Sequence, residues 1–172
     1  LLVSVSLAVA AMKLARCKVL VQELYCVETL ARVDVLCFDK TGTITTGNMN
    51  VVEIDDEVGE KLSSYLAYFE DENATSRALK KYLNCEKKWQ VAELGAFSSK
   101  NKYSYIRLAE GGTYFFGAYE FLGFDTPMTE YYENLKQQGF RILSLAYTKD
   151  NVDKPTNMEL IGHVVLSDEI KA

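Results

Sequence analysis

The segment Asp39-Lys40-Thr41-Gly42-Thr43-Ile44-Thr45 directly follows a short apolar run, Val33-Asp34-Val35-Leu36-Cys37-Phe38. The β-branched and aromatic residues of the run predict a buried strand, and the two glycines among polar residues at 39–47 predict a loop after it. Asp39 then stands at the carboxyl end of a parallel strand, where open α/β sheets bind their ligands. A carboxylate at that place can attack a phosphoryl group and form an aspartyl phosphate.

The residues next to Asp39 suit the same chemistry. Lys40 can offset phosphate charge, and Gly42 lets the backbone approach a ligand closely. Thr41, Thr43 and backbone N–H groups can donate hydrogen bonds to phosphate oxygens. Residue types and spacing alone leave an equal alternative, which is a polar turn that happens to contain an aspartate.

The segment 39–45 also resembles the phosphorylation motif D-K-T-G-T-[LI]-T of P-type (E1-E2) ATPases. Val27-Glu28-Thr29-Leu30 is similar to the V-E-[ST]-L sequence that precedes this motif in the family. The resemblance implies that Asp39 is the residue that becomes phosphorylated, with Lys40 and Thr41 beside it in the catalytic site. It also implies Mg²⁺ as a cofactor, bound by the Asp39 carboxylate and the Thr41 carbonyl oxygen together with a carboxylate outside this sequence.

Two further segments resemble motifs of the nucleotide-binding domain in the same family. Phe97-Ser98-Ser99, followed by Lys102, is similar to F-S-S-x-x-[KR], which implies that Phe97 stacks on adenine and that Lys102 adds a cation. Without the resemblance, Phe97 is explained as a core residue and the serines as a turn. Gly117-Ala118-Tyr119-Glu120 resembles K-G-A-x-E, except that Phe116 stands where the family has lysine. This departure predicts weaker ATP binding.

The last two resemblances lie toward the end of the sequence. Gly139-Phe140-Arg141-Ile142-Leu143-Ser144-Leu145-Ala146 is similar to G-x-R-[VI]-L-x-x-A, which implies that Arg141 reaches the ATP phosphates. Asp168-Glu169-Ile170-Lys171 resembles the D-P-x-R hinge of the family, with glutamate in place of proline. Asp168 is then implied to contact the ribose hydroxyls or to steer the hinge. From the residues alone, Arg141 and Asp168 are also explained as solvated surface charges.

The composition is that of an ordinary folded domain. The 172 residues are 48% hydrophobic and 25% charged with a net charge of −5, which excludes a disordered chain and disfavours a general nucleic-acid binder. Cys17, Cys26, Cys37 and Cys85 form no C-x-x-C pair, so we expect reduced, buried thiols and no zinc site. His163 lies in an apolar run and is predicted to be a hydrogen-bonded strand residue.

The first residues are apolar and uncharged. The uncharged stretch 1–12 is too short to cross a bilayer, which takes about 20 residues. A signal peptide with residues 8–10 as its cleavage site is an alternative, but no basic residue precedes it. The interpretation that fits better is the cytosolic end of a membrane helix, with Lys13, Arg16 and Lys18 on the cytoplasmic side.

Periodicity and turn signals divide the sequence into short elements. Helical spacing predicts helices, and apolar runs rich in β-branched residues predict strands, with Glu110-Gly111-Gly112 as a hairpin turn. Thr126-Pro127 is a start signal and Gly139 a stop signal for one helix. The predicted helices are 12–32, 57–70, 75–83 and 126–139, and the predicted strands after residue 38 are 50–54, 88–94, 102–109, 113–117, 140–147 and 158–166.

The fold class that these observations predict is α/β. The resemblance implies the first part of a Rossmann-like, haloacid dehalogenase-like phosphorylation domain, followed by an inserted α+β nucleotide-binding domain with a mainly antiparallel sheet flanked by helices. The expected boundaries are 1–11 for the end of a membrane helix, 12–47 for the phosphorylation domain, 48–164 for the nucleotide-binding domain and 165–172 for the hinge.

The implied function is that of the ATP-binding and phosphorylation segment of a P-type ATPase, which couples ATP hydrolysis to cation transport. ATP, the transported cation, the actuator domain and the remainder of the same polypeptide are the expected partners, and nucleic acid is not. The intact protein is expected to be a multi-pass membrane protein with this segment on its cytoplasmic side. The segment alone is expected to be inactive, because the T-G-D and G-D-G-x-N-D motifs of the family lie outside it.

Two alternatives from other functional classes remain open. A soluble haloacid dehalogenase-like phosphatase would carry a second aspartate two residues after the nucleophile, where this sequence has Thr41. Threonine is a poor general acid or base near neutral pH, which argues against that alternative. A non-catalytic nucleotide-binding module is the other alternative, and Phe116 gives it slight support.

Overall fold

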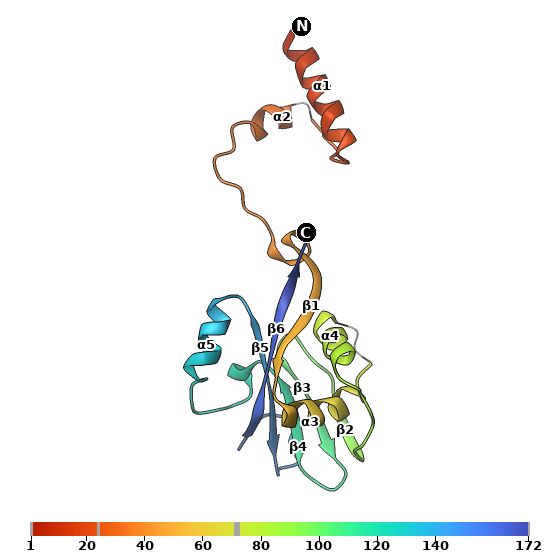
Figure 1. Ribbon diagram of the computed structural model, residues 1–172, viewed down its shortest axis with the longest axis vertical. Helices are drawn as coiled ribbons and strands as arrows, with labels where there is room; N and C mark the ends of the chain where they lie inside the picture. Colours follow the sequence, from red (N-terminus) through yellow and green to blue (C-terminus); the bar gives the residue numbers. More distant parts are fainter. Residues whose placement is uncertain (1, 24, 71–72, 172) are drawn as a thin grey trace. The chain divides into compact units, whose positions relative to one another are not determined.

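The computed structural model describes residues 2–23, 25–70 and 73–171, and the chain divides into two compact units, 1–39 and 40–172. The first unit holds two helices, α1 (Leu2–Arg16) and α2 (Tyr25–Leu30) (Figure 1). None of its described residues is buried. Within the described ranges, no helix combines the length and the apolar character needed to cross a membrane.

The single helix predicted over residues 12–32 is wrong, because the chain turns between α1 and α2. Lys18, two residues beyond the last residue of α1, has a positive φ of 61°. The Val19 N–H donates to the Leu14 carbonyl and the Lys18 N–H to the Ala15 carbonyl, both at 3.0 Å. This pair of bonds is a Schellman end, which satisfies carbonyl groups left over at a helix C-terminus. The sequence hides it, because lysine stands where glycine is usual.

The strand predicted at residues 33–38 is not formed, and its residues are exposed. A strand needs a neighbour to satisfy its backbone N–H and C=O groups. The sheet formed by the described residues lies entirely within 45–170, and the segment 33–38 forms no strand. Val35, Leu36 and Phe38 therefore remain exposed.

The four cysteines are free thiols, but the expectation that they are buried is wrong. Cys17, Cys26 and Cys37 are exposed, and Cys85 is half-buried. Burial raises the pKa of the Cys85 thiol above its ordinary value. Among the described residues, no group of three His, Cys, Asp or Glu side chains is placed to hold a metal ion.

The second unit is built on one six-stranded sheet with the strand order β1-β6-β5-β4-β3-β2 (Figure 1). Every strand is antiparallel to its neighbours, which confirms the predicted antiparallel sheet. The hairpin at residues 110–112 is confirmed between β3 and β4. The strands are β1 (Thr45–Ile54), β2 (Val91–Gly95), β3 (Tyr103–Leu108), β4 (Thr113–Gly117), β5 (Arg141–Thr148) and β6 (Glu159–Ile170).

Two strands are longer than the sequence predicts. β1 begins at Thr45 instead of residue 50, and β6 continues to Ile170 instead of ending at residue 166. The extensions pair with each other, since Thr45 lies opposite Ile170 and Met49 lies opposite Asp168. Residues 45–47 of the expected loop and residues 165–170 of the expected hinge thus belong to one antiparallel pair.

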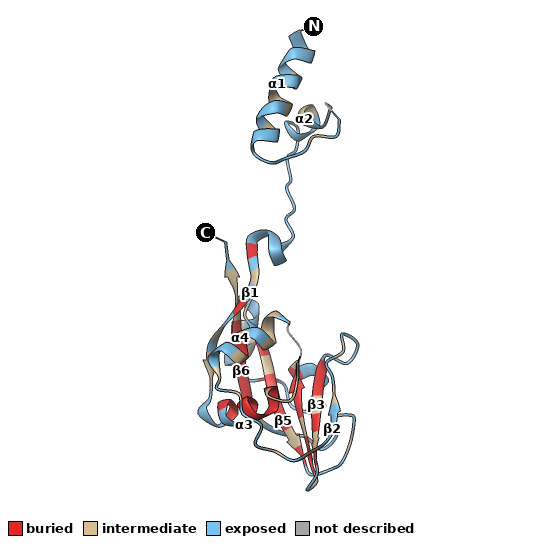
Figure 2. Cartoon of the chain, turned by 90° about the vertical axis from the view of Figure 1, so that its right-hand side faces the viewer, coloured by how far each residue is buried: buried red, intermediate tan, exposed pale blue. Residues whose placement is uncertain are grey.

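Helices cover both faces of the sheet (Figure 1), and Figure 2 shows buried residues in red on α3 and on the strands β3 and β6. The helices α3 (Asp56–Leu66) and α4 (Ala74–Tyr82) lie on one side, here called the α3–α4 face. The helix α5 (Glu130–Gln137) and the short 3₁₀ turn η2 (Tyr119–Phe121) lie on the other, the α5 face. The core of the α3–α4 face includes Val58, Leu62, Leu79, Ile106, Leu145 and Leu166, and that of the α5 face includes Phe115, Leu122, Ile142, Ala146 and Val165.

The helix predicted to begin at 126–127 begins later, at Glu130. Thr129 is the N-cap residue, with an extended backbone (φ −62°, ψ 149°), and the Tyr119 hydroxyl donates to the Thr126 carbonyl before it at 2.9 Å. The predicted stop is confirmed, because Gly139 has a positive φ of 92° directly beyond the helix end.

His163 of β6 is buried on the α5 face. Its Nδ1 lies 2.8 Å from Ser144 Oγ of β5, and its ring centroid lies 4.2 Å from that of Tyr132 of α5. Burial lowers the pKa of the imidazole below its ordinary value, although the charge of Asp55 acts in the opposite direction. The prediction of a hydrogen-bonded strand histidine is therefore confirmed.

Candidate functional site

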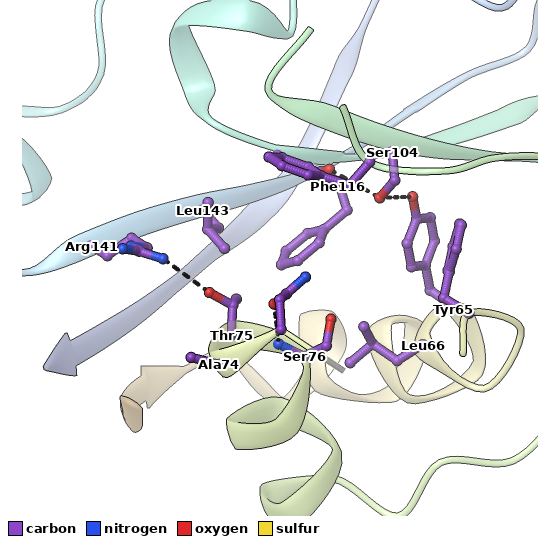
Figure 3. Close-up of a pocket in the computed structure, with 13 residues that line it drawn as sticks. Tyr65, Leu66, Ala74, Thr75, Ser76, Ser104, Phe116, Arg141 and Leu143 are labelled. Atoms are coloured by element: carbon purple, nitrogen blue, oxygen red, sulfur yellow. Dashed lines mark hydrogen bonds between the residues drawn. The ribbon is translucent and has the colours of Figure 1, made fainter. Parts of the chain in front are cut away.

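One pocket opens between the α3–α4 face of the sheet and the two helices that cover it (Figure 3). Its volume of about 410 Å³ lies within the range of roughly 300–1,000 Å³ typical of small-molecule sites. The lining comes from the end of α3, the start of α4, the β2–β3 loop and the strands β3, β4 and β5. Three residues predicted from separate motifs, Phe97, Gly117 and Arg141, line it together.

One end of the pocket is cationic. The exposed Arg141 begins β5, and its Nη1 donates to Thr75 Oγ1 at 3.1 Å (Figure 3). Thr75 lies in the first turn of α4, where the N-cap residue Asn73 accepts a hydrogen bond from the Ser76 N–H at 2.9 Å. The N–H groups of a first helical turn carry partial positive charge, so this end suits an anionic group. Arg141 has the only formal charge among the described lining residues.

The other end of the pocket is aromatic. Tyr65 is fully buried at the end of α3, and its hydroxyl donates to Ser104 Oγ at 2.9 Å (Figure 3). Burial raises the pKa of Tyr65 far above its ordinary value, so the hydroxyl stays protonated. Phe116 packs edge-on against the Tyr65 ring, and Phe69 lies on the same ring at a centroid distance of 5.1 Å. Phe97 is 49% exposed, which leaves its ring accessible to a ligand.

Gly117 and a tight turn shape the wall between β3 and β4. A Cβ atom at Gly117 would lie 2.4 Å from the Lys102 carbonyl oxygen, so a side chain does not fit there. The Ala118 N–H donates to the same carbonyl at 3.1 Å. Ser98 closes the turn, because its Oγ accepts from the Asn101 N–H at 3.0 Å and its carbonyl accepts from the Lys102 N–H at 2.8 Å.

The residues predicted to bind nucleotide therefore fall into two sets. Phe97, Gly117 and Arg141 line the pocket, whereas four neighbours are absent from the described lining residues. These four are Ser98, Ser99, Lys102 and Ala118. Three of them, Ser98, Lys102 and Ala118, form the hydrogen bonds of the turn beside the pocket wall. Direct contact of any of the four with a nucleotide stays a prediction.

Asp168 lies where the ends of β1 and β6 pair. It forms an ion pair with Lys40, the first residue of the irregular turn η1 (Lys40–Ile44). Beside it, the Thr46 hydroxyl donates to the Glu169 carboxylate at 2.7 Å and lowers the pKa of Glu169. Asp168 is not one of the described residues that line the pocket, and both the ribose contact and the hinge role stay predictions.

Asp39 and Thr41 are the residues to which the family resemblance assigns Mg²⁺. Asp39 is the last residue of the first unit and is exposed. Thr41 has φ −80° and ψ 116°, and Gly42 follows with a positive φ of 83° that favours glycine. A carboxylate and a carbonyl oxygen are hard ligands of the kind Mg²⁺ takes together with water and phosphate oxygens. The donor chemistry of these residues fits the implied ion.

Several pocket residues are not evident from sequence patterns. Tyr65 and Ser104 are 39 residues apart in the sequence, and Arg141 and Thr75 are 66 apart, yet each pair is hydrogen-bonded across the pocket wall. The sequence offers one indication of this arrangement, which is Asn73. Asparagine favours helix N-caps, and Asn73 caps the start of α4. The contacts themselves form only when the helices pack on the sheet.

No family model matches the chain. Over 184 aligned residues the chain is 38% identical to the probable cation-transporting ATPase exp7 of Streptococcus pneumoniae, which covers 99% of this chain and 23% of that protein. It is 31% identical over 183 residues to the calcium-transporting ATPase CtpE of Mycobacterium bovis, with the same coverage of 99% and 23%. The chain thus spans about a quarter of the length of these curated relatives.

A solved structure of a zinc-transporting PIB-type ATPase in the E2·Pi state has a similar fold. The TM-score is 0.57 at 18% identity, and the match covers 99% of this chain and 27% of that chain. At this identity the likeness shows the fold alone. The relatives align along nearly the whole sequence, including the phosphorylation-motif match at 39–45. From the motif, the relatives and the fold together, we conclude that the chain belongs to the P-type ATPase family.

Proposed function

We propose that this chain is the ATP-binding and phosphorylation segment of a cation-transporting P-type ATPase, and that the pocket on the α3–α4 face holds the nucleotide. The observation that carries the proposal is that Phe97, Gly117 and Arg141, from three separate motifs, line one cavity. An aromatic ring suits a purine base, and a guanidinium suits phosphate. The cation-transporting ATPases among the relatives support the same function.

The two ends of the pocket give ATP one orientation. The base packs on Phe97 at the aromatic end, and the phosphates lie toward Arg141 and the first turn of α4. Stacking of a base on an aromatic side chain is worth roughly 1–3 kcal/mol. A hydrogen bond to a charged group contributes roughly 1.5–3 kcal/mol. We therefore expect Phe97 and Arg141 to contribute comparable shares of the affinity.

Asp39 is the proposed nucleophile. Its carboxylate oxygen attacks the γ-phosphorus of ATP, the bond from that phosphorus to the β–γ bridging oxygen breaks, and ADP leaves with the electron pair. Mg²⁺, held by the Asp39 carboxylate and the Thr41 carbonyl, would neutralise charge on the phosphates. Lys40, which pairs with Asp168 here, places a second cation one residue from the nucleophile.

Thr41 favours a pump over the second candidate, a soluble haloacid dehalogenase-like phosphatase. Such a phosphatase uses an aspartate at this place as general acid and base, and a threonine hydroxyl cannot fill that role near neutral pH. The aspartyl phosphate then persists until another domain delivers hydrolysis. A long-lived intermediate suits transport, because phosphorylation must be coupled to slower conformational steps.

The rest of the proposed machinery lies outside this sequence. The membrane helices that select the cation and the actuator domain would belong to the same polypeptide, with this segment on the cytoplasmic side. The proposed parts of this chain are 1–11 as a membrane-helix end, 12–47 as the start of a haloacid dehalogenase-like phosphorylation domain, 48–164 as the nucleotide-binding domain and 165–172 as the hinge.

Phosphorylation of the intact ATPase in its membrane tests the proposal. Acid-stable transfer of labelled γ-phosphate from ATP is followed across a panel of cations that begins with Ca²⁺, the ion in the name of one relative. We expect one cation to switch labelling on and Asp39→Asn to abolish it. The matched control is Asp34→Asn, another exposed carboxylate of the first unit, which should label like the parent.

Two results would count against this proposal in different ways. Labelling of Asp39→Asn at the level of the parent would mean that Asp39 is not the nucleophile. Absence of labelling in the parent with every cation, combined with measurable ATP binding, would instead favour the non-catalytic nucleotide-binding module.

A further inference from the structure

We propose that a second pocket, between the helix α4 and the strand β1, binds an organic phosphate monoester that carries a small apolar group. The volume of this α4–β1 pocket is about 490 Å³, which lies within the range of small-molecule sites. Its described lining residues come from β1, from α4 and from the end of β6. Among the described lining residues of the two pockets, only Ala74 is shared with the nucleotide pocket, so this is a separate site.

One side of α4 faces the α4–β1 pocket. The lining residues of the helix recur at intervals of three and four residues, as Ala74, Arg77, Ala78 and Lys81. The strand β1 is an edge of the sheet and lies beside α4 (Figure 1), and it supplies residues 48–51 to the lining. The pocket is therefore formed by two elements that pack together in the folded unit.

The cations of the α4–β1 pocket favour a phosphate group. Arg77 and Lys81 are exposed and lie one helical turn apart on the side of α4 that lines the pocket. A phosphate monoester carries a charge of about −1.5 to −2 near neutral pH. A guanidinium binds two phosphate oxygens at once, and an ammonium group adds a compact second charge. The pair therefore matches a phosphate better than a singly charged carboxylate.

Glu169 is the one acidic side chain among the described lining residues of the α4–β1 pocket. The Thr46 hydroxyl donates to its carboxylate at 2.7 Å, and the Asn48 side-chain amide donates at 3.1 Å. These hydrogen bonds lower the pKa of Glu169, with a further contribution from the charge of Lys81, so the carboxylate stays ionised at neutral pH. Two cations and one carboxylate still leave the lining with a net positive charge, and Glu169 opposes the bound anion.

Much of the remaining lining is apolar. Met49 is 7% exposed and Val51 is half-buried, and both belong to the packing of the α3–α4 face. Ala74 and Ala78 add methyl groups, and Tyr82 adds a ring. Inorganic phosphate would leave this surface in contact with water, whereas an apolar substituent on the phosphate would cover it. A soluble phosphate monoester and the headgroup of phosphatidic acid both offer this chemistry.

The helix α4 also connects the α4–β1 pocket with the nucleotide pocket. The Thr75 hydroxyl donates to Met49 Sδ at 3.4 Å and accepts from Arg141 Nη1 at 3.1 Å. Phosphate groups bound in the two pockets would lie along the same short helix and repel each other. By linkage, each ligand then weakens the binding of the other by the same factor. This coupling rests on the proposed nucleotide site, whereas the α4–β1 pocket itself does not.

Calorimetric titration of the 172-residue chain with phenyl phosphate and with inorganic phosphate tests the site. We expect phenyl phosphate to bind more tightly than inorganic phosphate, and Lys81→Gln to weaken its binding about tenfold. Glu169→Gln should strengthen the binding about threefold, because a like charge is removed. The matched control is Lys88→Gln, an exposed cation outside the described lining of both pockets, which should change the affinity by less than about twofold.

Flotation with phosphatidylcholine vesicles, with and without phosphatidic acid, separates the two sources of the phosphate. Binding of phenyl phosphate alone that depends on Lys81 identifies a soluble ligand. Binding to the phosphatidic acid vesicles that depends on Lys81 identifies a lipid. The proposal is overturned if neither phenyl phosphate nor these vesicles bind, or if Lys81→Gln and Glu169→Gln leave the binding unchanged.

Titration of ATP at rising concentrations of phenyl phosphate distinguishes the α4–β1 pocket from the nucleotide pocket. We expect the apparent Kd of ATP to rise about threefold and then to level off, and the rise to disappear in Lys81→Gln. A rise without a plateau would mean that phenyl phosphate binds in the nucleotide pocket, which overturns the proposal. If the chain binds phenyl phosphate through Lys81 but binds no ATP, the proposed nucleotide site fails and the α4–β1 site stands.

Discussion

The two faces of the sheet share the same strands and use their buried groups differently. On the α5 face, aromatic rings and the hydrogen-bonded pair of His163 and Ser144 pack into small cores. On the α3–α4 face, the helices leave a pocket of about 410 Å³ with Tyr65 at one end and Arg141 at the other. We therefore expect that substitutions on the α5 face change the stability of this unit, and that substitutions in the pocket change nucleotide binding.

The largest expected effect is on stability and comes from the α5 face. Phe115 is fully buried there between the rings of Tyr103 and Tyr105. Phe115→Ala removes most of this packing and should lower the free energy of unfolding by about 3–5 kcal/mol. Urea denaturation of the 172-residue chain measures the loss. ATP affinity of the folded protein should stay close to wild type, and a large loss of affinity at unchanged stability would break the comparison.

The next effect is on affinity and comes from the cationic end of the pocket. Arg141 is exposed, so Arg141→Gln should change the free energy of unfolding by no more than about 0.5 kcal/mol. Loss of a hydrogen-bonded cation should weaken ATP binding by roughly 1.5–3 kcal/mol. Calorimetric titration measures the affinities for ATP and for adenosine. The substitution should weaken adenosine binding less than ATP binding, because adenosine carries no phosphate. The control is Lys154→Gln, an exposed cation of the β5–β6 loop, which should leave ATP affinity unchanged.

A similar but somewhat smaller effect is expected at the aromatic end. Phe97→Ala should weaken ATP binding by roughly 1–3 kcal/mol through lost stacking, and adenosine binding should weaken as much as ATP binding. Stability should hardly change, because Phe97 is 49% exposed. Equal loss for ATP and tripolyphosphate would contradict a base contact, since tripolyphosphate has no base to stack.

The patterns that the sequence predicted well are those set by neighbouring residues. The hairpin at 110–112 follows from two glycines, and both have positive φ in the structure. The end of α5 follows from Gly139 in the same way. The motif residues Phe97, Gly117 and Arg141 were identified by resemblance, and the structure brings them to one pocket.

The predictions that failed depend on distant partners or on a choice between similar local signals. The segment 33–38 has the composition of a strand, but its described residues form none. The start of α5 was misplaced because Thr129, and not Thr126, is the N-cap residue, and both are threonines that can cap a helix. From the sequence, Phe116 was interpreted only as the loss of a lysine. In the structure its ring packs against Tyr65 of α3, and its carbonyl oxygen accepts from Ser104 of β3, so its position in the pocket wall depends on residues from other elements.

The smallest expected effect is a pH dependence of stability that arises on the α5 face. Burial lowers the pKa of His163 below its ordinary value of 6.5, so below that pH the unfolded chain binds more protons than the folded chain. Stability should therefore be complete above about pH 6.5 and fall as the pH drops below it. Urea denaturation at about pH 7.5 and pH 5.5 measures this change, which should be smaller in His163→Gln. A steeper fall in the variant would contradict this assignment.

The central claim is that the pocket on the α3–α4 face is the ATP site. Titration of the isotope-labelled chain with ATP, followed by nuclear magnetic resonance of backbone amides, tests it most directly. The predicted result is a set of shifts at Ser76, Phe97, Gly117 and Arg141, while the amides of Tyr132 and Leu135 in α5 stay in place. Shifts concentrated on the α5 face, or no shifts at saturating ATP, would contradict the claim.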